Sequence, residues 1–158
     1  MRLRRFRTRY LDLEFAADPR VRIRIVERPG RWMSAAGIDS LLADLRAVVT
    51  ESVPGGTLDY GVFTGNPACL AQAIITILYD ADDGRPVAFN ALAVLPVTLG
   101  GREEHVLHFG LAMIAPRVRG RGLSWVSTAS RSCSCSHTTS FARCGSATSP
   151  RCRASSGW

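Results

Sequence analysis

The hydrophobic pattern of the chain predicts a strand followed by a helix. Apolar residues and arginines alternate over residues 20–26, and this period of two is typical of a strand with one buried face. A Pro-Gly pair then ends the alternation. Over residues 36–50 apolar residues recur at helical spacing, which predicts a helix with one apolar stripe. The stripe contains Ile38, Leu41, Leu42, Leu45, Val48 and Val49.

Three further strands are expected in the middle of the chain. Residues 72–79 are rich in Ile and Thr, and an Asp-Ala-Asp-Asp-Gly turn separates them from the apolar run at 86–96. A Gly-Gly turn leads to a third run at 105–114, which Pro116 ends. Short turns between consecutive strands predict an antiparallel meander. The fold class is therefore α+β, mainly a meander with a flanking helix.

The composition changes abruptly at Ser124. Residues 124–158 contain 11 Ser, four Thr, four Cys and four Arg, and they contain no Leu, Ile, Asp or Glu. Such a segment cannot bury enough apolar surface to offset the entropy lost on ordering, so we expect a disordered C-terminal tail. The chain thus divides into an Arg-rich N-terminal strand region at 1–35, a central domain at 36–123, and the tail at 124–158.

The net charge of +7 is concentrated at the two ends of the chain. Residues 1–28 hold nine Arg and four acids, residues 29–123 hold seven Arg and nine acids, and the tail holds four Arg and no acid. A nucleic-acid-binding patch is one interpretation of the first segment. The alternation of its arginines with apolar residues favours a solvated strand edge instead, and no aromatic stacking pattern accompanies them.

The hydropathy of the chain predicts a cytoplasmic protein without a membrane partner. No apolar run reaches the roughly 20 residues that cross a bilayer. The N-terminal arginines are not followed by the apolar segment of a secretory signal.

A glycine loop, Arg117-Val118-Arg119-Gly120-Arg121-Gly122, follows the third strand of the meander and precedes a helix expected to begin near Gly122. Glycines let the backbone approach a ligand closely, and the unpaired amides at a helix start attract anions. The three arginines add positive charge, so a diphosphate suits the loop. It lacks the downstream acid of a dinucleotide site and the Gly-Lys-Ser/Thr ending of a P-loop. A polar turn with incidental glycines is the alternative interpretation.

The order of these elements resembles the GNAT family of N-acyltransferases. The resemblance covers residues 36–123 and includes the first helix, the hairpin around residues 82–87, the strand at 107–116 and the Arg-x-x-Gly-x-Gly loop. It implies that acetyl-CoA or another acyl-CoA is bound and that an unknown amine is the acceptor. In that family the loop amides hold the CoA pyrophosphate and the preceding strand offers backbone groups to the pantetheine and thioester. The implied binding residues are Met113, Ile114, Arg117, Val118, Arg119, Gly120, Arg121 and Gly122.

The acyl transfer that the resemblance implies is direct attack of an amine on a thioester, which needs a base and a group that polarises the carbonyl. Glu104 and His108 are candidate bases, together with their neighbours Glu103 and His105. The two glutamates follow a Gly-Gly turn, where solvated side chains are expected, and the two histidines face opposite sides of a strand. The family often draws a tyrosine general acid from its C-terminal half, but this chain has no tyrosine after Tyr79.

The cysteines of the chain do not form a recognisable metal motif. Those at positions 133, 135, 144 and 152, with His137 nearby, lack a C-x-x-C pair, which disfavours a zinc site. Disulfides are disfavoured in a reducing cytoplasm. Cys69 stands alone, and a small core or loop residue is favoured over a nucleophile. No metal site is therefore expected.

The tail does not suit the helices and strands that follow the glycine loop in a GNAT domain. A metal or disulfide module, a functional disordered extension and a changed reading frame are the three interpretations. All 20 basic residues are Arg, which indicates GC-rich coding DNA. One choice of GC-leaning codons for residues 126–143, read in a shifted frame, gives an apolar helix with a polar exit, which is compatible with a changed reading frame. The coding DNA across residues 124–128 tests this hypothesis, which is refuted if the shifted frame contains stop codons or lacks the apolar pattern.

Two functions follow from the expectation of an incomplete, frame-changed domain. The first is truncated N-acyltransferase activity that is weak or absent, since half of the acceptor site would be missing. The second is a non-catalytic remnant that binds CoA. A basic nucleic-acid-binding protein is the third and least favoured function.

Overall fold

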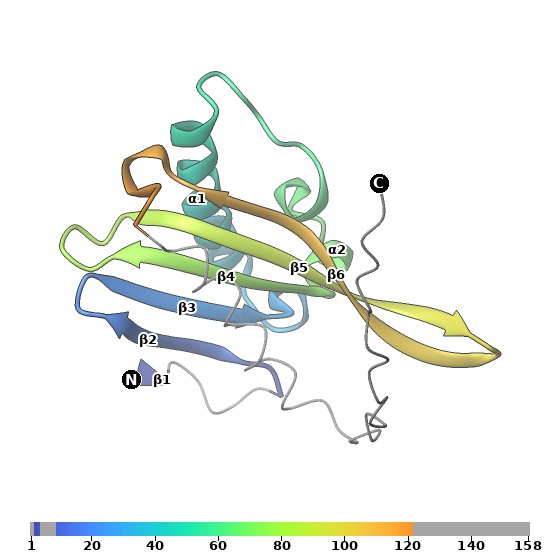
Figure 1. The fold of residues 1–158 in the computed structure, drawn as a ribbon. Helices are drawn as coiled ribbons and strands as arrows, with labels where there is room; N and C mark the ends of the chain where they lie inside the picture. Colours follow the sequence, from blue (N-terminus) through green and yellow to red (C-terminus); the bar gives the residue numbers. More distant parts are fainter. Residues whose placement is uncertain (1, 4–8, 122–158) are drawn as a thin grey trace, which may run out of the picture.

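A six-stranded antiparallel sheet with one long helix on one face makes up the described part of the protein (Figure 1). The structure is a computed structural model, and it describes residues 2–3 and 9–121. The sheet order follows the chain order. The strands are β1 (Arg2–Leu3), β2 (Asp12–Asp18), β3 (Val21–Glu27), β4 (Ala73–Asp80), β5 (Pro86–Leu99) and β6 (Arg102–Ile114). The α+β class and the antiparallel meander of β4, β5 and β6 are therefore confirmed.

The flanking helix predicted over residues 36–50 is confirmed as α1 (Ala35–Ser52). Ser34 caps its N-terminus, because the Ser34 hydroxyl accepts a hydrogen bond from the Gly37 amide at 3.3 Å. Most of the predicted stripe is buried and packs on β4 and β5. Three short helical turns also lie between β3 and β4. η1 (Pro29–Arg31) precedes α1, and η2 (Gly61–Thr64) and α2 (Pro67–Leu70) follow it.

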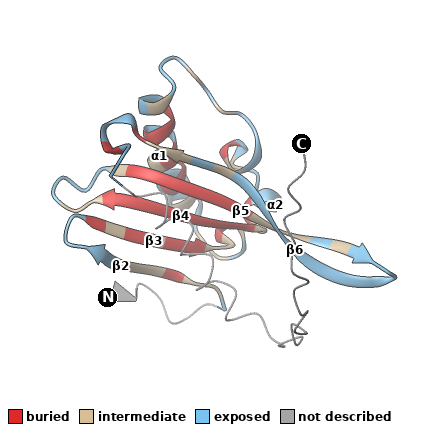
Figure 2. Cartoon of the chain, viewed as in Figure 1, coloured by how far each residue is buried: buried red, intermediate tan, exposed pale blue. Residues whose placement is uncertain are grey.

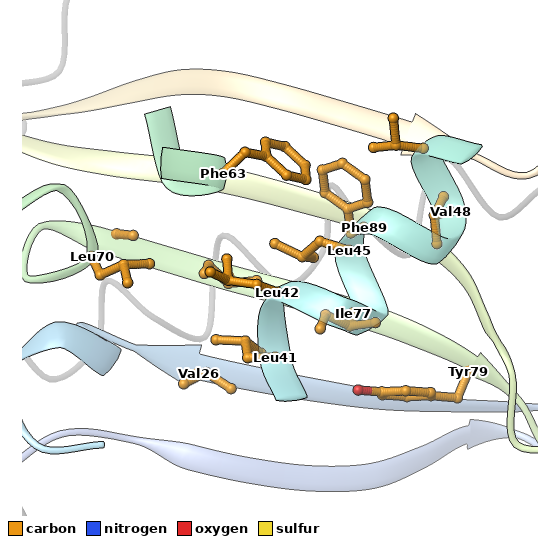
Figure 3. Close-up of a cluster of buried hydrophobic side chains, with 13 residues drawn as sticks. Val26, Leu41, Leu42, Leu45, Val48, Phe63, Leu70, Ile77, Tyr79 and Phe89 are labelled. Carbon is orange, nitrogen blue, oxygen red and sulfur yellow. The ribbon is translucent and has the colours of Figure 1, made fainter. Parts of the chain in front are cut away.

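The main core lies between α1 and the sheet, and Figure 3 shows its side chains. The rings of Phe63 and Phe89 meet edge to face with their centroids 5.8 Å apart, so η2 is fixed over β5. A second cluster of buried side chains comes from alternate positions of the same strands, including Ile23, Leu78 and Val87. β4 and the first half of β5 are therefore buried on both faces, as their red segments show in Figure 2.

The strand with one buried face that the alternation predicts is confirmed as β3, because its apolar residues are buried and its arginines are only partly buried. The expectation that this strand is a solvated edge is wrong. β3 lies between β2 and β4, and it pairs with β4 over seven residues. Its arginines are neutralised by β2: Arg24 binds both carboxylate oxygens of Asp12 at 3.0 and 3.1 Å, and Arg22 binds Glu14 at 2.7 Å. These side chains do not form a free basic patch, so they give no support to nucleic-acid binding.

The N-terminal region at 1–35 and the central region at 36–123 contribute strands to one sheet. Two predictions fall outside the described residues, namely the helix expected from Gly122 and the disordered tail at 124–158.

Candidate functional site

The register of β5 and β6 contains a β-bulge at Gly110. Ala91 lies opposite Leu111 and Leu92 lies opposite Phe109, so Gly110 is the extra residue on β6. A Cβ on Gly110 would lie 2.8 Å from the Ala91 carbonyl oxygen, and this close approach requires glycine. Bulges disrupt a ladder locally and redirect the adjacent backbone and side chains, which is why they are common beside active sites.

A cavity of about 310 Å³ adjoins this bulge, and we refer to it as the bulge cavity. Residues 60–63 and α2 form one side of it, and the facing parts of β5 and β6 form the other. The lining is mostly apolar, with polar groups from only a few side chains. The apolar side chains include Val62, Phe63, Leu92, Leu95 and Leu111, and the polar ones are Tyr60, Cys69, Gln72 and His108.

Of the four candidate bases on β6, His108 lines the bulge cavity and the other three do not. Glu103, Glu104 and His105 lie towards the exposed end of the β5–β6 hairpin, which projects beyond the rest of the sheet (Figure 1). The expected solvation of the two glutamates agrees with their exposure. His108 is therefore the predicted base that lies beside a site where a small molecule can bind.

Two of the lining residues were missed by sequence reasoning. Tyr60 precedes η2 and Cys69 lies on α2, and neither belongs to a motif. Cys69 is an exposed free thiol on α2, so the interpretation of it as a core residue is wrong. Only the packing of the connection between α1 and β4 against β5 and β6 brings these side chains near His108.

The glycine loop follows β6 and begins with the turn η3 (Pro116–Val118). The Arg117 guanidinium donates from Nε to both carboxylate oxygens of Glu51 at 3.0 and 3.1 Å, and also reaches the Pro86 carbonyl at 3.3 Å. Arg119 Nε donates to the Ile114 carbonyl at 3.2 Å. Two of the three loop arginines therefore anchor the loop to the protein.

Of the remaining loop residues that the structure describes, Gly120 and Arg121 face solvent and Val118 does not. Val118 is buried and anchors the turn, while Arg121 is exposed. Gly120 has a φ of 78°, the left-handed region that favours glycine, and a Cβ there would meet open space. Within the described residues the Gly120 amide donates no hydrogen bond. One amide and the Arg121 guanidinium are thus available to an anion, and Gly122 lies outside the described residues.

The two predicted backbone contacts on β6 differ in their surroundings. Met113 lies opposite Phe89 and packs against the main core. The Ile114 carbonyl accepts hydrogen bonds from the Ser52 hydroxyl at 3.4 Å and from Arg119, so it is already satisfied by the protein. Within the described residues β6 is the last strand of the sheet, and alternate backbone groups of such a strand point away from its neighbour.

A polar hollow of about 190 Å³ lies under α1, away from the bulge cavity. The Tyr79 hydroxyl donates to Asp44 at 2.7 Å, and Arg24 and its partner Asp12 lie beside it. Burial, followed by the hydrogen bond to Asp44, raises the pKa of Tyr79 well above its ordinary value. The hydrogen bond from Tyr79 to Asp44 helps to hold α1 on the sheet. Arg22 and Arg24 are paired with carboxylates, so the described residues of this hollow offer no unpaired cation to a ligand.

No group of three or more His, Cys, Asp and Glu side chains within residues 2–3 and 9–121 is arranged to hold a metal ion. The cysteines at 133, 135, 144 and 152 lie outside that part of the chain. None of the helices formed by the described residues is long and apolar enough to span a bilayer.

The arrangement suits an elongated ligand that carries an anion at one end. The backbone rises about 3.3 Å per strand residue, so roughly 13 Å separate Gly110 at the cavity from Ile114 at the loop. None of the described strands pairs with the outer edge of β6, so such a ligand could pair with this edge between these two points. No protein-family model matches the chain, and no curated protein shows significant similarity to it.

Proposed function

We propose that the chain is a GNAT-type N-acyltransferase domain of weak activity that transfers an acyl group from acetyl-CoA, or another acyl-CoA, to an amine. The acyl-CoA would lie along the free edge of β6, with its pyrophosphate at the glycine loop and its thioester near the bulge. The bulge cavity would hold the amine. The single observation that carries this proposal is the Gly110 bulge, which adjoins a cavity on the same strand that leads into the glycine loop.

The chemistry follows from these positions. The amine nitrogen attacks the thioester carbonyl carbon, a C–N bond forms, and the C–S bond breaks. His108 receives the proton lost by the nitrogen, directly or through water, and the released thiolate of CoA takes up a proton. A backbone amide beside the bulge would polarise the thioester carbonyl, because the bulge interrupts the regular ladder there.

The loop supplies positive charge for the pyrophosphate at one end. The Arg121 guanidinium and the free Gly120 amide provide the direct contacts, and Arg119 adds charge nearby. Arg117 acts as an anchor for the loop, since its Nε donates to Glu51 and its Nη2 donates to the Pro86 carbonyl. The chain departs from the family's pattern at several positions. Arg117 and the Ile114 carbonyl are bound within the protein, and the amides of Val118, Arg119 and Arg121 donate to carbonyls of the same segment.

Calorimetric titration with acetyl-CoA and with CoA tests the binding step. We expect Gly120→Val to weaken the binding of both ligands at least tenfold, because the valine side chain would occupy the approach to the Gly120 amide. The matched control is Gly101→Val in the β5–β6 turn, where φ is also positive, at 79°, and a Cβ also meets open space. A folded wild-type chain that binds neither ligand, or equal losses in both variants, contradicts the proposal.

A second candidate function is acyl-CoA binding without turnover. Among the described residues, the bulge cavity is lined by one imidazole, that of the exposed His108, and by no carboxylate. This scarcity of bases supports the second candidate. Mass-spectrometric detection of acylated amine separates the two functions. Product formation that falls on His108→Ala supports the enzyme, whereas binding without product over an amine panel supports the second candidate.

A further inference from the structure

We infer that the acceptor is a small apolar monoamine, with one aromatic ring or branched aliphatic group, and not a polycationic amine. This inference rests on the proposed acyl transfer and concerns the chemistry of the bulge cavity. It follows from the charge, the depth and the size of that cavity.

The charge of the lining excludes a polycation on energetic grounds. Within the described residues, no Asp, Glu or Arg side chain lines the bulge cavity. A second ammonium group placed among Val62, Leu92 and Leu111 would lose its hydration without gaining a carboxylate partner. Burying an unpaired charge in this way is strongly unfavourable, so diamines and basic peptides are poor occupants.

The depth of the lining orients a monoamine. The floor is apolar and closed, since Phe63 is 4% exposed and Leu92 is 5% exposed. The rim is polar and open, since Tyr60 is 57% exposed and His108 is also exposed. A ring or branched chain therefore packs on the floor, while its nitrogen stays at the rim near the imidazole. Partial desolvation there lowers the pKa of the amine, which increases its nucleophilic neutral form.

The size of the cavity limits the acceptor. Ligand pockets commonly measure roughly 300–1,000 Å³, and about 310 Å³ lies at the lower limit of this range. A single ring with a short chain fits such a volume, and a large polycyclic or peptide acceptor does not.

The test compares 2-phenylethylamine with 1,4-diaminobutane as acceptors for acetyl-CoA. We expect kcat/KM to be at least tenfold higher for phenylethylamine. Ala93→Asp places a carboxylate in the lining at a half-buried position of β5, and should reduce this ratio at least tenfold. The charge-matched control is Ala36→Asp on the exposed first turn of α1, which should leave the ratio unchanged.

A second measurement uses the wild-type chain and does not require acetyl-CoA. Cys69 lines the cavity as an exposed thiol, so its alkylation rate reports occupancy in the wild-type chain. Peptide mass spectrometry resolves Cys69 from the other cysteines. We expect phenylethylamine to slow alkylation at least threefold and diaminobutane to have no effect at the same concentration.

The outcomes separate this inference from the proposed function. Acetyl-CoA binding together with a preference for diaminobutane overturns the inference and leaves acyl transfer standing. Absence of acetyl-CoA binding overturns the proposed function, and equal protection of Cys69 by both amines then overturns the apolar preference as well. Selective protection by phenylethylamine supports the preference in either case.

Discussion

Replacement of Gly110 by alanine is the sharpest test of the bulge geometry. The new Cβ would lie 2.8 Å from the Ala91 carbonyl oxygen, whereas ordinary contact begins at 3.4 Å. The obstructing atom belongs to the backbone of β5, so no side-chain rotation relieves the contact. The two strands must separate locally, which disturbs both the ladder and the wall of the bulge cavity.

Two opposing effects set the size of the change. Overpacking typically costs about 1–3 kcal/mol, and the lower entropy of the unfolded chain with alanine returns about 0.4–1 kcal/mol. The steric cost is larger, so we expect Gly110→Ala to lower the free energy of unfolding by about 0.5–2 kcal/mol. Gly110→Val should lower it further, since it adds two methyl groups to the same contact.

Urea unfolding followed by circular dichroism measures this change as a lower midpoint with an unaltered slope. The control is Gly101→Asn in the open β5–β6 turn, where asparagine tolerates the positive φ and should stay within about 0.5 kcal/mol of wild type. A Gly110→Ala protein that is as stable as wild type would show that β5 and β6 do not approach closely at this point, and the reasoning about the bulge would fail.

Three further predictions concern the packing that supports the site. Phe89→Ala should lower the free energy of unfolding by about 3–5 kcal/mol in urea titrations, whereas Leu99→Ala, at an exposed position, should change it by less than about 0.5 kcal/mol. Asp12→Ala should cost about 3 kcal/mol because Arg24 loses its buried partner, and Arg24→Met in that background should recover part of the loss. Because the pKa of Tyr79 is raised in the folded state, the unfolded state releases this proton first, near pH 10, and the stability of the wild type should fall above about pH 10. Tyr79→Phe should reduce that fall, which urea midpoints measured between pH 8 and 11 would show.

Much of the fold could be predicted because periodic segments carry their own signal. The stripe on α1 and the runs that form β4, β5 and β6 each have a repeat that fits one element. β2 was missed because Ala16 and Ala17 weaken its alternation and its charged residues suggest a loop. Its importance lies in pairing, since Asp12 and Glu14 neutralise the arginines of β3 through a register that no local pattern specifies.

The candidate site was less predictable, because it depends on contacts between distant segments. A lone glycine within an apolar strand pattern can indicate a bulge, so Gly110 carried a usable signal. The cavity carried none, since Tyr60, Cys69 and His108 meet only after the chain folds. Likewise, nothing in the glycine loop indicates that Arg117 binds Glu51, which lies 66 positions away.

Hydrogen exchange with and without acetyl-CoA tests the central claim most directly, namely that an acyl-CoA lies along β6 from the bulge to the glycine loop. Peptide-resolved mass spectrometry should show slower amide exchange over residues 108–121 in the presence of saturating acetyl-CoA. Peptides of β2 and β3 should be unaffected, because the proposed acyl-CoA does not contact these strands. Protection confined to residues 9–28, or no protection over residues 108–121 at a concentration that saturates binding, would contradict the account.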